Sequence, residues 1–383
     1  MATTTLTSRR PPNSLLVSSE TQKSSLSPLS RITLFFPKSC QLSSLVAVAS
    51  RQEPWLSLKP ETRIRTRSDP LRVIAEASSA SAEPVVPPYN VLITGSTKGI
   101  GYALAKEFLK AGDNVVICSR SAERVEAAVQ TLRGEFGEPR VWGTKCDIRE
   151  AQDVKNLVAF AQQNLKYIDI WINNAGSNAY SFKPLAEASD EDLIEVVTTN
   201  TIGLMICCRE AINMMLKQPR GGHIFNIDGA GSDGRPTPRF AAYGATKRSV
   251  VHLTKSLQAE LQMQDVKNVV VHNLSPGMVT TDLLMTGATT KQVKHALHTP
   301  LSVFRFLYDL VKLLVMQAKF FINVLAEKPE TVAEFLVPNI RSIPTSGARK
   351  PTYIRFLTGL KAYSQIFSRL AFGARRNRYI LED

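Results

Sequence analysis

Short apolar runs alternate with stretches of helical spacing between residues 89 and 282. The apolar runs lie at residues 91–93, 114–118, 141–146, 168–172, 222–227 and 269–273. Runs of this length, bounded by polar residues, are typical of buried strands. Because strands and helices alternate, the pattern predicts a parallel sheet with right-handed crossovers. We therefore expect an α/β fold with a Rossmann-type doubly wound parallel sheet, in a single domain.

A glycine-rich turn, TGSTKGIG at residues 94–101, follows the first apolar run and precedes helical spacing. Strand, glycine turn and helix open a dinucleotide-binding βαβ unit. Glycine lets the chain turn tightly, so that backbone N–H groups and the positive end of the helix face a pyrophosphate. Taken alone, the spacing Gly-x-x-x-Gly-x-Gly also fits a plain loop. The candidate cofactor-binding residues here are Thr94, Gly95, Ser96, Thr97, Lys98, Gly99, Ile100 and Gly101.

The residues after the second apolar run bear on the choice of cofactor. Ser119 and Arg120 stand where an NAD-specific site carries an acid for the ribose 2′-hydroxyl. Together with Lys98, they place two cations where a 2′-phosphate would bind. The sequence therefore favours NADPH over NADH. The alternative is that Arg120 and Lys98 are exposed cations at the ends of loops.

Tyr243 and Lys247 open a helical stretch with the spacing Tyr-x-x-x-Lys. Residues four apart lie on one face of a helix. A carbonyl that receives hydride must also receive a proton, and a phenol with a pKa near 10 is a slow donor at neutral pH. A neighbouring cation favours the phenolate, so Lys247 is expected to lower the pKa of Tyr243 and to bond the nicotinamide ribose. Alone, this spacing equally describes a surface pair.

The glycine turn, NNAG at 173–176, Val197-Thr198-Thr199-Asn200 and Tyr243-x-x-x-Lys247 follow one another along the chain. In these motifs residues 89–282 resemble the short-chain dehydrogenase/reductase family. The resemblance implies that Tyr243 donates the proton, that Lys247 assists it, and that Asn200 bends its helix and holds a relay water. It implies further cofactor contacts at Asp147, Ile148, Asn174, Ala175, Gly176, Pro276, Gly277, Val279 and Thr281.

One position departs from the family, which places a serine after the fifth strand to hold the substrate oxygen. Here the strand is followed by Asp228-Gly229-Ala230-Gly231-Ser232, and no serine occupies the usual place. Ser232 is the candidate substitute and completes the predicted catalytic set. The alternative is that Ser232 is a turn serine without a catalytic part.

The net charge of +14 on 383 residues is concentrated at the two ends. Residues 1–80 hold eleven Lys and Arg against five Asp and Glu, and residues 341–383 hold nine against two. Because the middle is nearly neutral, no nucleic-acid partner is indicated. Residues 1–48 have the composition of a chloroplast transit peptide, and residues 49–88 that of a disordered linker. A disordered tail that is never cleaved is the alternative.

Five scattered cysteines form no Cys-x-x-Cys pair, and no histidine lies at metal-ligand spacing from them. We therefore expect reduced thiols and no metal. The chain also lacks a run of about 18 uncharged apolar residues, so a spanning helix is not expected.

The part of the chain after Thr281 is predicted to form a substrate lid at 283–345. Within it, residues 301–325 have helical spacing with the polar residues on one narrow stripe. Such a helix suits a membrane interface or an apolar substrate, and a helix buried in the protein's own core is an equal alternative. Residues 346–383 form a basic, aromatic C-terminal extension of a kind found at membrane surfaces.

The stretches IFNIDGAGSDGRPTP and FLTGLKAYSQIFSRLAFGARRN resemble the NOL-type (non-yellow-coloring-like) chlorophyll(ide) b reductases of plant chloroplasts. This implies NADPH-dependent reduction of the C7 formyl group of chlorophyll b to 7-hydroxymethyl chlorophyll a, the first step of chlorophyll b breakdown. It also implies a peripheral place on the stromal side of the thylakoid membrane, in complex with a membrane-spanning paralogous reductase and a light-harvesting complex. Two alternatives share the core motifs: another plastid carbonyl reductase, such as a ketoacyl-carrier reductase, and a catalytically silent NADPH-binding scaffold.

Overall fold

The computed structural model describes residues 85–137, 139–179, 183–288, 319–347 and 350–380. The predicted transit peptide, the linker up to residue 84 and most of the predicted amphipathic helix lie outside these residues. Of that helix only 319–325 is described, and it is helical.

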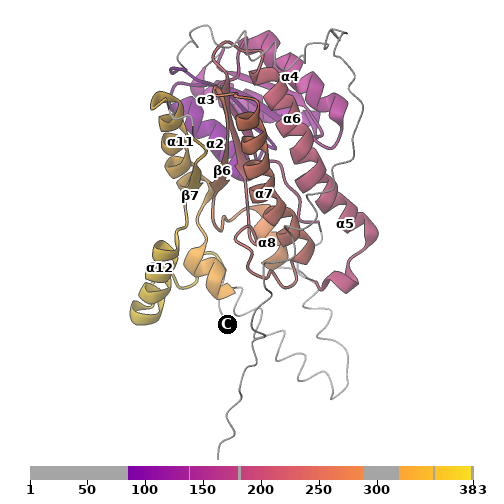
Figure 1. Ribbon diagram of the computed structural model, residues 1–383. Coiled ribbons are helices and arrows are strands. Elements are labelled where there is room, and N and C mark those ends of the chain that lie inside the picture. The colour runs from indigo at the N-terminus through magenta and orange to yellow at the C-terminus, as the bar shows by residue number, and fades with distance from the viewer. Residues whose placement is uncertain (1–84, 138, 180–182, 289–318, 348–349, 381–383) are drawn as a thin grey trace, which may run out of the picture. The chain divides into compact units, whose positions relative to one another are not determined.

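Seven parallel strands form one sheet in the order β3-β2-β1-β4-β5-β6-β7 (Figure 1). The strands are β1 (Asn90–Thr94), β2 (Asn114–Ser119), β3 (Val141–Lys145), β4 (Ile170–Asn173), β5 (Gly222–Ile227), β6 (Val269–Ser275) and β7 (Tyr353–Arg355). The predicted doubly wound parallel sheet is confirmed. Strand order reverses between β1 and β4, the point at which such sheets bind their ligands.

Helices cover both faces of this sheet (Figure 1). One face carries α2 (Gly99–Lys110), α3 (Ala122–Phe136) and α11 (Pro329–Thr345). The other carries α4 (Ala151–Leu165), α6 (Leu204–Met215) and α7 (Ala241–Met263). Besides the helical residues 319–325, the other described helices are the 3-10 helix η1 (Leu185–Glu187), α5 (Asp190–Val197), the π-helix η2 (Thr198–Gly203), α8 (Asp282–Ala288) and α12 (Gly359–Phe372).

Capping residues set several helix boundaries. The Ser121 hydroxyl accepts a hydrogen bond from the Arg124 N–H at the start of α3, and Thr358 does the same at the start of α12. These bonds use N–H groups that have no partner inside the helix. Gly373 ends α12 in the left-handed conformation, at φ +65°, which glycine adopts without strain.

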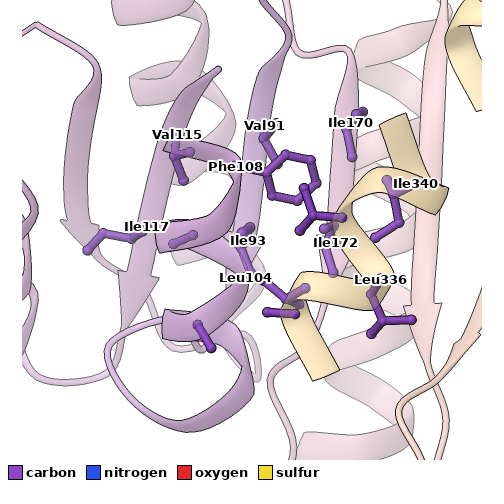
Figure 2. Close-up of a cluster of buried hydrophobic side chains, with 14 of the residues drawn as sticks. Val91, Ile93, Leu104, Phe108, Val115, Ile117, Ile170, Ile172, Leu336 and Ile340 are labelled. Carbon is purple, nitrogen blue, oxygen red and sulfur yellow. The ribbon is translucent and has the colours of Figure 1, made fainter. Parts of the chain in front are cut away.

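The core fills both sides of the sheet because successive strand residues point to opposite faces. Figure 2 shows one side, where strand side chains pack against α2 and α11. The labelled residues are Val91, Ile93, Leu104, Phe108, Val115, Ile117, Ile170, Ile172, Leu336 and Ile340. The residues between them, such as Leu92 and Trp171, are buried on the other side. Strands covered on both faces are apolar throughout, which is why the sequence pattern identified them.

Two elements beyond the predicted Rossmann range are integral to the sheet and its layers. Helix α11 lies in the range predicted as a lid, yet Leu336 and Ile340 are buried in the sheet's core. Strand β7, from the predicted extension, pairs with β6 in the register Asn273↔Tyr353. A three-residue strand is too short to show an apolar run, so the sequence pattern did not predict it.

The end of the chain packs back onto residues 319–327. Asn323 is buried and accepts hydrogen bonds from the Tyr379 and Ile380 N–H groups, at 2.7 and 3.0 Å. Glu327 pairs with Arg375 and Arg378, each at 2.7 Å. Nowhere in the described ranges does a helix combine the length and the apolar character that a bilayer crossing requires.

Candidate active site

The glycine turn between β1 and α2, called the cradle below, packs so closely on the loop after β4 that larger residues would not fit. Gly95 and Gly99 have φ values of +63° and +59°, which L side chains rarely adopt. A Cβ on Gly95 would lie 2.8 Å from the Ala175 Cα, and one on Gly101 would lie 2.4 Å from the Asn174 Nδ2. The turn therefore brings backbone close to the loop after β4, as a pyrophosphate site requires.

The N-terminus of α2 faces this cradle without a side-chain cap. Lys98 stands at the N-cap and its side chain makes no capping hydrogen bond. The first N–H groups of a helix lack intrahelical partners and attract anions. Uncapped N–H groups and a glycine cradle together fit the pyrophosphate of a dinucleotide. Thr97 and Ile100 are half-buried beside them, and Ile100 packs against the core.

Ser96 holds the turn in place from inside. Its side chain is fully buried, and its hydroxyl donates to the Ile93 carbonyl at 2.6 Å and accepts from the Cys118 N–H at 3.1 Å. Both bonds are internal to the fold. The Ser96 N–H also donates inside the fold, to the Cys118 carbonyl at 3.1 Å, so Ser96 fixes the shape of the turn and its predicted cofactor contact stays a prediction.

The NNAG loop after β4 is tied to the glycine turn. The Thr94 Oγ1 accepts from the Asn174 and Ala175 N–H groups, both at 3.1 Å. The Asn174 amide donates to the Thr94 and Gly95 carbonyls at 2.9 and 2.8 Å. Two motifs separated by some eighty residues thus form one surface at the strand ends.

The residues predicted to surround the adenosine lie beyond β2 and β3. Arg120 is exposed and pairs with Glu195 at 2.9 Å. Arg149, which the sequence did not single out, pairs with Asp147 and also with Glu195. Burial raises the pKa of Asp147, but its bonds to Arg149 outweigh this and hold the pKa below its usual value. Two arginines therefore share one acidic partner at this end of the site.

Other predicted residues at this end have different environments. Ile148 is buried, and a Cβ on Gly203 would lie 2.9 Å from it. Ser119 donates to the Ser121 carbonyl at 3.3 Å. Lys98 pairs with Asp282 at 2.7 Å, both side chains being well exposed. An exposed pair of this kind contributes about 0–1 kcal/mol, so Lys98 can exchange partners at little cost.

Tyr243 and Lys247 lie on one face of α7, at the ends of β4 and β5. The Lys247 Nζ is 5.7 Å from the centre of the Tyr243 ring and donates to the Ile227 carbonyl at 3.1 Å. Burial lowers the pKa of Lys247 to about 8. A Cβ on Gly176 would lie 3.7 Å from the Lys247 Nζ, so the NNAG loop reaches this pair.

The pKa of Tyr243 does not follow the sequence-based expectation. Burial of the phenol raises its pKa above the usual value, and the nearby charge of Asp228 raises it further. The lowering expected from Lys247 is not found here, because burial of the phenol sets the direction and the Lys247 ammonium donates to the Ile227 carbonyl.

Asn200 lies in η2, between α5 and α6. Its Oδ1 accepts from the Ser177 N–H at 2.8 Å, and its Nδ2 donates to the Ser177 carbonyl and to the Thr246 Oγ1 at 2.8 and 3.1 Å. The predicted bend of this helix is present as a π-helical turn, a feature frequent at functional sites. Asn200 joins the NNAG loop to the turn of α7 between Tyr243 and Lys247.

The loop after β5 folds inward. Ser232 is buried, its N–H donates to the Gly229 carbonyl at 3.0 Å, and Arg248 donates to its carbonyl at 2.7 Å. Beside it, Asp228 is buried and accepts a hydrogen bond from the hydroxyl of Tyr353. Asp228 was not a predicted site residue, and Tyr353 was predicted only as one aromatic residue of the basic C-terminal extension. The position of Asp228 at a strand end was the only signal for it, and Tyr353 had none, because β7 was not predicted.

The segment after β6 closes the other side. A Cβ on Gly99 would lie 3.2 Å from the Thr281 Cγ2, so this segment touches the glycine turn. Val279 is buried and forms an isolated bridge with Glu327. Pro276 is buried, and Gly277, at φ +74°, lies against Leu357. The predicted nicotinamide side of the site is thereby assembled from the β6 end and the C-terminal part of the chain.

The assembled site has one extended surface for a dinucleotide and one proton-donating group at its end. When bound there, a nicotinamide cofactor supplies hydride. The described residues contain no group of three or more His, Cys, Asp or Glu side chains placed as metal ligands. An arrangement of this kind suits hydride transfer coupled to proton donation, for which Tyr243 is the predicted donor.

Comparison with known proteins agrees with this geometry. The family model for short chain dehydrogenases matches residues 89–292. The chain is 77% identical over 305 residues to the chloroplastic chlorophyll(ide) b reductase NOL of Arabidopsis thaliana. The aligned region covers 80% of each of the two chains. It is 75% identical over 299 residues to the rice protein of the same name, from Oryza sativa subsp. japonica, covering 78% of this chain and 80% of that one.

A longer rice protein is also similar. The chloroplastic protein NYC1, named a probable chlorophyll(ide) b reductase, is 42% identical over 275 residues. The match covers 68% of this chain and 49% of NYC1. NYC1 therefore has about half of its length outside the shared region.

Solved structures show the same fold with nicotinamide cofactors. An actinorhodin polyketide ketoreductase with NADPH is 25% identical, with a TM-score of 0.54, covering 70% of this chain and 95% of that one. The 3-ketoacyl-(acyl-carrier-protein) reductase from Brucella melitensis, complexed with NADH, is 26% identical, with a TM-score of 0.54, covering 70% and 96%.

Proposed function

We propose that this chain, which belongs to the short-chain dehydrogenase family, reduces the C7 formyl group of chlorophyll b to a hydroxymethyl group with NADPH. The observation that carries the proposal is the 77% identity to a chlorophyll(ide) b reductase over 80% of both chains. The described site supplies what this reaction needs, namely a dinucleotide surface that ends at a proton donor.

The chain's own residues perform the proton half of the reaction. NADPH held by the glycine turn and the NNAG loop would supply the hydride that the formyl carbon takes up. The Tyr243 Oη donates its proton to the formyl oxygen, so that the C=O π bond is replaced by one new C–H and one new O–H bond. Lys247, with a pKa of about 8, is charged at neutral pH and is placed beside Tyr243 to hold the nicotinamide ribose. Asn200 keeps the NNAG loop and α7 in register, and Ser232 steadies the oxygen.

The preference for NADPH rests on the cations at the adenosine end. Arg120 and Lys98 are both well exposed, and each is held by one acid. Exposed ion pairs contribute little to stability, and a 2′-phosphate carries more negative charge than a carboxylate. A bound 2′-phosphate would therefore displace Glu195 from Arg120 and Asp282 from Lys98. Glu195 also pairs with Arg149, so it would keep this second ion pair after Arg120 turned to the 2′-phosphate.

The place of action that we propose is the stromal side of the thylakoid membrane, with α12 as the membrane contact. The similar proteins are named chloroplastic. Leu360, Tyr363, Phe367 and Leu370 of α12 are between 65% and 83% exposed. Arg369 is turned inward and lies over the Phe320 ring, at 5.6 Å. An amphipathic helix whose apolar side faces out is suited to the interface of a bilayer.

A complex with a membrane-spanning paralogue and a light-harvesting complex completes the proposal. It is supported by the similarity to NYC1, whose additional length lies outside the shared region. An enzyme that lies on the membrane and binds a partner there would reach pigment without extracting it into water.

Single-protein turnover tests the function. The chain from residue 86 onward, NADPH and chlorophyll b are mixed in mild detergent, and pigment conversion is followed by absorbance. Conversion with NADPH and little with NADH is expected. NADPH binding without conversion would instead identify a silent scaffold. Conversion of a ketoacyl-carrier substrate in place of chlorophyll b would identify a different carbonyl reductase.

A further inference from the structure

Glu327 holds the segment that follows β6 in place. Its N–H donates to the Met278 carbonyl at 3.0 Å, and its carbonyl accepts from the Thr280 N–H at 2.9 Å. The Thr280 hydroxyl donates to the same carbonyl at 3.3 Å, across 47 positions of the sequence. These bonds accompany the isolated parallel bridge between Val279 and Glu327. One residue from a distant part of the chain therefore fixes the backbone of residues 278–280.

The segment after β6 also touches the cradle. Thr281 continues residues 278–280, and a Cβ on Gly99 would lie 3.2 Å from the Thr281 Cγ2. The next residue, Asp282, pairs with Lys98 at 2.7 Å. The backbone that Glu327 fixes therefore leads directly to the surface on which a dinucleotide would lie.

The sheet order places this segment at the reactive end of that surface. Arg120, proposed to bind the 2′-phosphate, follows β2, on one side of the point between β1 and β4 where strand order reverses. The segment follows β6, on the other side of that point and next to β5, at whose end the Ile227 carbonyl accepts from Lys247. A dinucleotide with its adenosine near Arg120 therefore has its nicotinamide near residues 278–281.

The Glu327 side chain is bound by two arginines near the end of the chain. Glu327 is 6% exposed, and its two carboxylate oxygens pair with Arg375 and Arg378, each at 2.7 Å. Burial alone raises the pKa of Glu327, but the hydrogen bonds from Arg378 and Arg375 outweigh it and hold the pKa below its usual value. Arg375 also donates to the Ala326 carbonyl at 3.1 Å. A buried carboxylate keeps its charge only with such partners, so the arginines determine where Glu327 lies.

The same end of the chain is anchored a second time, four residues before Glu327. Asn323 is fully buried, and its Nδ2 donates to the Ile380 carbonyl at 2.6 Å. Its Oδ1 accepts from the N–H groups of Tyr379 and Ile380. Residues 323–327 therefore lie between the end of the chain on one side and the segment after β6 on the other.

We propose that Glu327, held by Arg375 and Arg378, is a positioning residue that sets the place of the nicotinamide half of the cofactor. The arginines fix its side chain, and its backbone in turn fixes residues 278–280. The cradle is held separately, by the NNAG loop and by Ser96, so it keeps its shape when this link is lost. The inference rests on the proposed function for its cofactor, NADPH, but not for its pigment.

The first test measures two ligands by calorimetry, with the wild type and with Glu327→Gln. One ligand is NADPH, and the other is 2′-phospho-ADP-ribose, which contains every part of NADPH except the nicotinamide. Glutamine keeps the shape and the backbone bonds of Glu327 but removes the charge that holds the arginines. The variant's affinity for NADPH should fall about 10-fold, the effect of one lost hydrogen bond, and that for 2′-phospho-ADP-ribose should stay within about 2-fold.

The two affinities separate positioning from folding. A residue that only supports the fold would weaken both ligands equally, and that result would overturn the proposal. Unchanged affinities for both ligands would overturn it too. So would a wild-type protein that binds 2′-phospho-ADP-ribose as tightly as NADPH, because no nicotinamide contact would then exist to be positioned. Absence of pigment conversion would contradict the proposed function alone, since these affinities are measured without pigment.

The second test removes the same link from the arginine side. Arg375→Gln combined with Arg378→Gln should give the same selective loss of NADPH affinity. Adding Glu327→Gln to this double variant should weaken NADPH no further, because residues that share one interaction have non-additive effects. A further loss of similar size would show that Glu327 acts without the arginines and would overturn the proposal.

Asp113→Asn is the matched control, because it removes another buried carboxylate that pairs with an arginine. Asp113 is fully buried and pairs with Arg341 at 2.8 Å, at the amino end of β2. This variant should lower the melting temperature without changing the ratio of the two affinities. If Glu327→Gln fails to fold, Arg378→Gln decides, because that side chain is 34% exposed and Arg375 still pairs with the carboxylate. It should weaken NADPH selectively, and equal or absent weakening would overturn the proposal.

Discussion

The Asn200 Nδ2 donates a hydrogen bond to the Thr246 Oγ1 at 3.1 Å, from a π-helical turn to the first turns of α7. Thr246 directly precedes Lys247 and in turn donates to the Tyr243 carbonyl at 2.7 Å. The position of the catalytic pair is therefore coupled to a helix whose regular spacing is interrupted at Asn200.

Asn200→Ala should lower kcat by about 100-fold, the usual effect of disturbing a positioned proton donor. The same change should leave cofactor affinity within a few-fold, because Asn200 bonds only the Ser177 backbone and Thr246. Thr198→Val is the matched control, since Thr198 lies in the same turn and bonds only α5 carbonyls. Equal losses of kcat in the two variants would contradict a specific role for Asn200.

Tyr243→Phe should reduce turnover by about 10³-fold or more while NADPH still binds. Phenylalanine keeps the ring and removes the hydroxyl that is proposed to protonate the formyl oxygen. The chain contains a matched control, because Tyr102 and Lys106 of α2 have the same spacing. Tyr102→Phe should retain full turnover, measured in the same pigment assay with cofactor binding followed by fluorescence. Turnover that survives Tyr243→Phe would remove this phenol from the reaction.

The sheet and the glycine turn were predictable, whereas the surroundings of Tyr243 were not. Strands buried on both faces are continuous apolar runs, and Gly95 and Gly99 are required by the positive φ angles of a single turn, so both leave a local pattern. The Asp228–Tyr353 contact joins residues 125 positions apart through a strand of three residues. Its effect on the pKa of Tyr243 depends on burial, which the spacing of Tyr243 and Lys247 does not report.

Gly95→Ala and Gly134→Ala should act in opposite directions. At Gly95 the positive φ and the 2.8 Å approach to Ala175 make an added Cβ costly, by about 1–3 kcal/mol of stability, and cofactor affinity should fall with it. At Gly134, inside α3, an added Cβ meets nothing within 4 Å, so alanine should stabilise the protein by about 0.5–1 kcal/mol. Chemical denaturation of both variants measures this. A Gly95→Ala protein with wild-type NADPH affinity would argue against the cradle.

Arg120→Ala should weaken NADPH about 10-fold or more and change NADH little, since a charged hydrogen bond to a 2′-phosphate contributes about 1.5–3 kcal/mol. Glu195→Gln should have the opposite sign, because it releases Arg120 from its ion pair. Titration of each variant with both cofactors gives the ratio directly. If Arg120→Ala weakened the two cofactors equally, Arg120 would contribute to folding of the site and not to the choice between them.

Phe367→Ser with Leu370→Ser should release the protein from membranes. Both side chains are well exposed, so the fold should be unaffected, and the loss of two large apolar groups from an interface should lower partitioning by about 10–100-fold. Flotation with galactolipid vesicles, with and without phosphatidylglycerol, measures this, and anionic lipid should strengthen binding because the C-terminal residues are basic. Met263→Ser is the matched control, because Met263 is 88% exposed at the end of α7. Membrane binding that persists in the double variant, or that falls equally in Met263→Ser, would show that α12 is not the membrane contact. If the double variant instead elutes later than the wild type in size-exclusion chromatography, α12 pairs two copies of the chain.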